Sequence, residues 1–251
     1  MSNQEVYRAL VEHQAGAGPV ALCTVIRAQG SVPRREGAKM LVYPDGRIVG
    51  TVGGGELEAR VIQQALELAA RRESGTVNIP LVDPSKGDAG VCGGEMDVFV
   101  EPVLAEPTLL VVGCGHVGKE IAFLAKWLGF RVAVTDDRIE FCNPEWLPGA
   151  DVYLPGFIPQ ALEDFQITDQ TYITAVTRGV RADTEALPHL LRSPTPYVGV
   201  IGSRRRWSVA VQELQALGVP DELIRRAHTP IGLDIGAETP REIAISILAE
   251  I

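Results

Sequence analysis

The run Leu109-Leu110-Val111-Val112-Gly113-Cys114-Gly115-His116-Val117-Gly118 predicts a Rossmann-type α/β domain. An apolar strand leads directly into the pattern G-x-G-x-x-G, which opens a helix. In this pattern the first glycine permits a tight turn, the second lets the backbone approach a phosphate, and the third lets helix and strand pack closely. Gly113, Gly115, His116 and Gly118 are therefore candidate ligand-binding residues. The alternative is a Rossmann domain that keeps its glycines for packing alone.

Asp136 supports the ligand-binding interpretation. It ends the next predicted strand, where an acidic side chain commonly receives ribose hydroxyls. The neighbouring Asp137 is a poorer candidate, because successive strand side chains point to opposite faces of the sheet. The glycine loop and Asp136 together predict NAD(P) or another nucleotide as one class of ligand.

The sequence on both sides of this run alternates regularly between apolar strands and helices. Strands are expected at 109–113, 131–137, 151–154, 171–176 and 197–202, with helices between them and a long helix after Ser203. Such an alternation is typical of a parallel sheet covered on both faces. The predicted fold class of this part is α/β, a Rossmann-like doubly wound parallel sheet.

The first part of the chain predicts a mixed α/β domain. Helices are expected at 5–13 and 56–72, strands at 19–28 and 96–100, and a hairpin with strands at 39–43 and 47–52. The segment 101–107 contains two prolines and predicts a linker. The chain is therefore expected to divide into domains 1–104 and 105–251.

Two loops of the N-terminal domain are candidate ligand sites. Gly53, Gly54, Gly55 and Glu56 open its second helix, where exposed backbone amides suit an anion. Cys92 and Gly93 lie in a polar loop of the kind that serves ligands. Cys92 is interpreted as a reactive thiolate, a sulfur carrier or a soft ligand, with an ordinary turn cysteine as the alternative.

Later strand ends of the Rossmann domain offer anion-binding groups and no general base. Ser203 and Arg204, with the two arginines that follow, could clamp a phosphate or simply form surface ion pairs. The segment 177–179 also suits an anion. An oxidoreductase needs a proton donor or acceptor here, yet His189 and His228 are expected to be structural or exposed. No catalytic residue is predicted.

Composition excludes several classes of protein. The net charge of −9, with acidic residues in excess in both halves, leaves no basic face for nucleic acid or an anionic membrane. Four cysteines without a C-x-x-C pair argue against a zinc site and a disulfide framework. No run is apolar enough for a signal-peptide core or a membrane span. We therefore expect a cytoplasmic protein.

The motifs resemble those of the XdhC/CoxI family, the accessory proteins of molybdenum hydroxylases, over nearly the whole chain. The matching segments are 30–34, 37–40, 50–58, 92–94, 113–118, 136–138, 199–203, 230–236 and 239–247. Two departures limit what can be transferred. Many CoxI-like members carry Gly-Gly-Cys where Gly53-Gly54-Gly55 stands here, and the family's Thr-His-Gly-His is replaced by Thr177-Arg178-Gly179-Val180.

The resemblance implies a cytoplasmic, usually dimeric cofactor chaperone rather than an enzyme. Such a protein binds molybdenum cofactor, supports its sulfuration and inserts it into a xanthine dehydrogenase-type molybdenum hydroxylase, with a cysteine desulfurase as a further partner. Molybdopterin carries a phosphate and an ene-dithiolate, which suit glycine-loop amides and Cys92. We expect the ligand where the N-terminal loops face the Rossmann glycine loop. The alternatives are an NAD(P)-dependent oxidoreductase and a nucleotide-sensing regulatory protein.

Overall fold

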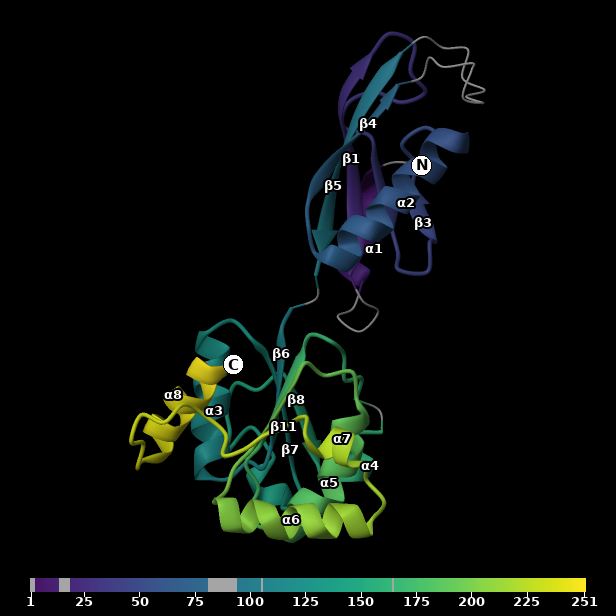
Figure 1. Ribbon diagram of the computed structural model, residues 1–251. Coiled ribbons are helices and arrows are strands. Elements are labelled where there is room, and N and C mark those ends of the chain that lie inside the picture. Colours follow the sequence, from purple (N-terminus) through teal and green to yellow (C-terminus); the bar gives the residue numbers. More distant parts are fainter. Residues whose placement is uncertain (1–2, 14–18, 81–93, 105, 164) are drawn as a thin grey trace. The chain divides into compact units, whose positions relative to one another are not determined.

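The computed structural model describes residues 3–13, 19–80, 94–104, 106–163 and 165–251. The chain divides into two compact units, Met1–Ala105 and Glu106–Ile251. Each unit has its own sheet and its own hydrophobic core (Figure 1). The last strand of the first unit continues through Glu101 and Pro102, where Pro102 lies opposite Ala21. The expected linker is therefore shorter than its two prolines indicated.

The first unit is an antiparallel five-stranded sheet with the order β3-β2-β1-β5-β4. Its elements are α1 (Asn3–Glu12), β1 (Val20–Gln29), β2 (Lys39–Val42), β3 (Ile48–Gly50), α2 (Gly55–Arg71), β4 (Gly75–Pro80) and β5 (Glu95–Val103). Helix α2 buries Leu57, Val61 and Ala65, which recur every fourth residue and so line one side of the helix. They pack against alternate residues of the sheet, including Val25 and Val98.

The second unit is a parallel six-stranded sheet with the order β11-β10-β9-β6-β7-β8. Its strands are β6 (Thr108–Val112), β7 (Arg131–Asp136), β8 (Val152–Pro155), β9 (Thr171–Ala175), β10 (Tyr197–Val200) and β11 (Ala227–His228). Its helices are α3 (His116–Trp127), the short 3-10 helix η2 (Ile139–Phe141), α4 (Ile158–Ala161), α5 (Val180–Arg192), α6 (Arg204–Ala216), α7 (Asp221–Ile224) and α8 (Pro240–Glu250). This strand order is the one found in dinucleotide-binding Rossmann domains.

Helices cover both faces of the parallel sheet. All five residues of β6 are buried, with Leu110 and Val112 in one core and Leu109 and Val111 in the other. Helices α4, α5 and α6 contribute to the first core, while α3 and α8 lie side by side over the second (Figure 1). The predicted doubly wound α/β fold is confirmed.

The order of the strands also predicts the edge of the sheet at which a ligand binds. Helices α3 and α5 follow the neighbouring strands β6 and β9 but lie on opposite faces of the sheet. Open α/β sheets bind ligands at such a switch point, outside the carboxyl ends of the strands. In the described ranges no helix combines the length and the apolar character needed to cross a membrane.

Candidate functional site

Two of the three glycines between the end of β6 and the first turn of α3 are required by the fold. Gly113 has a φ of +108°, and a Cβ added there would lie 2.7 Å from the carbonyl oxygen of Val176. A Cβ on Gly118 would lie 1.9 Å from the carbonyl oxygen of Gly113. These two positions therefore form the tight turn and the close contact of helix with strand that the sequence pattern predicts.

Gly115 differs from the other two. It precedes α3 with φ −68° and ψ −167°, a conformation open to any residue. The nearest atom to an added Cβ is Nη2 of Arg138, at 3.9 Å. Neither the backbone conformation nor a close neighbour requires glycine here, and the missing side chain leaves space at the amino end of α3. That space suits the predicted approach of a phosphate.

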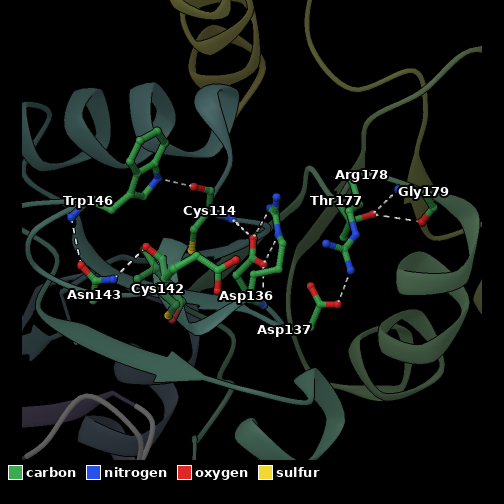
Figure 2. A network of polar contacts seen from close by, with 12 residues as sticks. Cys114, Asp136, Asp137, Cys142, Asn143, Trp146, Thr177, Arg178 and Gly179 are labelled. Atoms are coloured by element: carbon green, nitrogen blue, oxygen red, sulfur yellow. Dashed lines mark hydrogen bonds and ion pairs between the residues drawn. The ribbon is translucent and has the colours of Figure 1, made fainter.

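Asp136 holds this loop to the end of β7. Its side chain is 3% exposed, and it accepts hydrogen bonds from the Cys114 amide at 2.7 Å and from the Arg138 amide at 2.9 Å. Nε and Nη2 of Arg138 donate to its two oxygens, each at 2.9 Å. Burial opposes ionisation of Asp136, but the hydrogen bonds from Arg138 and Cys114 outweigh it and lower its pKa. Figure 2 shows Asp136 beside Cys114.

Arg138 places a fixed positive charge next to the open space at Gly115. Its guanidinium carbon lies 4.1 Å from the centre of the Phe141 ring, and its side chain is 26% exposed. In the sequence, Arg138 is distinguished only as part of the family motif at 136–138. A cation two residues after the strand-end acid is the signal that could have identified it.

A second ion pair joins the strands on either side of β6. Arg178, after β9, donates to Asp137, after β7, at 2.7 Å (Figure 2). A pocket of about 410 Å³ adjoins the pair, and its lining includes Phe157 and Gly179. Asp137 is therefore directed across the strand ends, a role that the sequence did not predict.

An aromatic group covers the other side of the glycine loop. Nε1 of Trp146 donates to the Cys114 carbonyl at 2.7 Å (Figure 2). The His116 ring meets the Trp146 ring edge to face at 5.5 Å, and Nζ of Lys119 lies 4.5 Å from the Trp146 ring centre. His116 is exposed at the first position of α3. It is thus available to a ligand at the loop.

The three arginines that begin α6 do not act together. Ser203 caps the helix by accepting a hydrogen bond from the Arg206 amide at 3.2 Å. The Arg206 side chain turns inward and donates to buried Asp183 at 2.6 Å and to the Thr177 carbonyl at 3.1 Å. Arg204 is exposed, and no hydrogen bond or ion pair joins its side chain to any residue in the described ranges. Of the three arginines, Arg204 and Arg205 take no part in the contacts of Arg206 with Asp183 and Thr177.

The N-terminal glycine loop is organised around an internal carboxylate. Glu58 accepts hydrogen bonds from the amides of Val52 and Gly54, both at 3.3 Å, and from the Thr51 hydroxyl. The Gly53 amide donates to Thr51 Oγ1 at 3.1 Å. Glu58 therefore stands where the sequence analysis expected the anion of a ligand.

The neighbouring positions of that loop have different surroundings. Glu56 is paired with Arg60 at 3.3 Å on the surface of α2. Gly55 is exposed, has a φ of +61°, and would place an added Cβ in open space. These two residues leave the outer side of the helix start accessible.

The remaining residues to be placed are cysteines and histidines. Cys92 and Gly93 lie outside the described residues. Cys23 is buried in β1, and burial raises the pKa of its thiol to about 12. His189 is exposed, and His228 stacks on Tyr197 at 4.7 Å, in line with a structural role. Among the described residues no cluster of His, Cys, Asp or Glu has the arrangement of a metal site.

Comparison with protein families gives two matches that divide the chain as the structure does. Residues 109–251 match the family model described as the XdhC Rossmann domain. Residues 13–80 match the model of the XdhC and CoxI family. The first match spans the parallel sheet and all of its helices.

Individual proteins agree with this assignment. The chain is similar to the uncharacterized protein YqeB of Escherichia coli (strain K12), with 38% identity over 235 residues, and this region is 93% of this chain but only 43% of YqeB. It is 23% identical over 279 aligned positions to the molybdenum cofactor insertion chaperone PaoD of Escherichia coli (strain K12), covering 99% of this chain and 87% of PaoD.

A solved structure is similar to this chain along its full length. The crystal structure of a protein described as a xanthine dehydrogenase from Bacillus halodurans has a TM-score of 0.51 and 25% identity, and the match covers 100% of this chain and 94% of that one. The family matches and the two-unit structure lead to the same conclusion: the chain belongs to the XdhC and CoxI family.

Proposed function

We propose that this protein binds molybdenum cofactor, supports its sulfuration and inserts it into a xanthine dehydrogenase-type molybdenum hydroxylase. The observation that carries the proposal is the open space at Gly115, at the amino end of α3 and beside the Arg138 guanidinium. Helix amino ends and arginine both favour phosphate. The name of the similar protein PaoD, a molybdenum cofactor insertion chaperone, supports the same cargo.

The candidate residues suit two chemical groups of such a cargo, its phosphate and its molybdenum. Gly115, His116 and Arg138 would bind the phosphate of molybdopterin, and Arg204 offers a further free cation at the same edge of the sheet. Cys92, in the first unit, is proposed separately as a soft ligand for molybdenum or as a sulfur carrier. We propose further that the protein is a cytoplasmic homodimer and that it receives sulfur from a cysteine desulfurase.

A nucleotide-sensing role is the second candidate. It is supported by the Rossmann strand order and by the pocket of about 410 Å³ beside Arg178 and Phe157. A flat base suits a pocket lined by an aromatic ring and a guanidinium. In this case the ligand changes the affinity for a partner protein, and molybdenum has no part in the effect.

Retention of molybdenum by the purified protein tests the main proposal. The protein is mixed with molybdenum cofactor, separated by ultrafiltration and analysed for metal. We expect stoichiometric retention by the wild type and at least a tenfold loss with Gly115→Val, because the side chain fills the space left for the phosphate. Cys92→Ala tests the proposed soft ligand in the same assay.

Arg205→Ala is the matched control, because Arg205 lies on the exposed side of α6. It should retain molybdenum as the wild type does. Absence of retention by the wild type, together with tight binding of NAD or NADP, would reject the chaperone proposal in favour of the nucleotide-sensing role.

A further inference from the structure

The carboxylate that usually recognises ribose is saturated in this protein. An ionised carboxylate has about four acceptor sites, and Asp136 receives four donors. Oδ1 accepts from the amide and Nε of Arg138, both at 2.9 Å. Oδ2 accepts from the Cys114 amide at 2.7 Å and from Nη2 of Arg138 at 2.9 Å. A ribose diol would therefore have to displace donors from a carboxylate that is 3% exposed.

Arg138, in contrast to Asp136, has free hydrogen-bonding groups beside the open space at Gly115. Nε–H and one Nη2–H are directed at Asp136, and within the described residues the other three N–H groups of the guanidinium have no hydrogen-bond acceptor. The guanidinium carbon also lies over the Phe141 ring, 4.1 Å from its centre. Nη2 is also the nearest atom to the space at Gly115. A fixed guanidinium with free donors matches the oxygens of a phosphate.

We infer that Arg138 determines ligand specificity at this edge, by selecting a phosphate monoester and rejecting a ribose diol. The inference rests on the proposed function, since it requires a phosphate ligand at the glycine loop. Two ligands share this chemistry: molybdopterin through its phosphate, and NADP through the 2′-phosphate that replaces one ribose hydroxyl. NAD carries the diol and lacks the monoester.

The pair NAD and NADP isolates the effect of a single phosphate monoester. Isothermal titration of the full chain should show NADP binding at least tenfold more tightly than NAD. In Arg138→Met this preference should disappear and NAD should bind more tightly than to the wild type, because Asp136 regains free acceptor sites. Lys126→Met is the matched control, since Lys126 pairs with Asp151 just before β8, at the amino ends of the strands, and it should keep the wild-type ratio.

A second variant covers the case in which Arg138→Met fails to fold. Asp136→Asn with Arg138→Met removes both charges, so no buried carboxylate is left unpaired. This double variant should lose the preference for NADP without gaining affinity for NAD. The inference is overturned if it keeps the preference, if wild type binds NAD as tightly as NADP, or if wild type binds neither NADP nor inorganic phosphate.

Molybdenum retention separates this inference from the proposed function and identifies the source of the phosphate. If the wild type retains molybdenum, NADP should displace it at lower concentration than NAD, which supports both ideas. If no molybdenum is retained while the preference for NADP depends on Arg138, the specificity inference stands for a nucleotide ligand and the chaperone proposal fails.

Discussion

Gly115 caps α3 and Gly118 lies in the first turn of that helix, yet of these two glycines the fold needs only Gly118. Gly118→Ala would force a Cβ to within 1.9 Å of the Gly113 carbonyl, where no flexible side chain can move away. Overpacking of this kind destabilises by about 1–3 kcal/mol. Gly115→Ala, whose Cβ meets no atom nearer than 3.9 Å, should cost less than about 1 kcal/mol, which reflects the preference for glycine over alanine at a helix N-cap. Urea unfolding of the two variants checks the contrast, and equal losses would contradict it.

Asp136 should make stability depend on acidic pH. Asp136→Asn removes the buried carboxylate that pairs with Arg138. We expect the free energy of unfolding to fall by about 3 kcal/mol at pH 7. Because the pKa of Asp136 is lowered from 3.8 in the folded protein, its contribution is present at neutral pH and is lost as pH falls through that lowered value. The difference between wild type and variant should therefore narrow below about pH 3.8.

Urea unfolding at several pH values measures this difference, with Asp137→Asn as the control. Asp137 pairs with the more exposed Arg178, so its loss should cost no more than about 1 kcal/mol. A difference for Asp136→Asn that stays constant down to pH 2 would show that the carboxylate charge is not its cause.

At the scale of elements, Arg206 joins the start of α6 to β9 and α5. Its partner Asp183 is 1% exposed, so Arg206→Met leaves an unpaired buried carboxylate and should cost about 3–5 kcal/mol. Asp183→Leu combined with Arg206→Met should cost much less than the sum of the single changes, because both charges are removed. A double-mutant cycle by urea unfolding measures the coupling, and additive losses would contradict the network. Arg205→Met, on the exposed side of α6, is the control.

The same elements show which parts of the structure could be predicted from sequence. Alternating apolar strands and helices predicted the parallel sheet, because burial on both faces imposes nearly continuous apolar runs. Strand β11 was not predicted, since its two residues, Ala227–His228, are too few to produce a pattern. The inward turn of Arg206 was not predicted either. The choice between solvent and Asp183 depends on a contact between positions 23 residues apart.

In the candidate site, too, some features could be predicted from the sequence and others could not. The glycine spacing predicted the loop, because backbone sterics act between near neighbours in sequence. The saturation of Asp136 and the position of Glu58 in the N-terminal loop could not be predicted in this way. Both depend on which of several nearby donors and acceptors meet after folding, and composition does not determine that choice.

At the scale of the whole molecule, the paired charges at the strand ends affect how fast a ligand arrives. Asp136 neutralises Arg138, and Asp137 neutralises Arg178, so neither arginine projects a field far into solvent. The chain as a whole carries a net charge of −9. An anionic ligand therefore meets repulsion over most of its diffusional approach and attraction only at contact. Added salt screens the repulsion, so stopped-flow association should become faster as ionic strength rises, the reverse of a protein that steers its ligand with a basic surface.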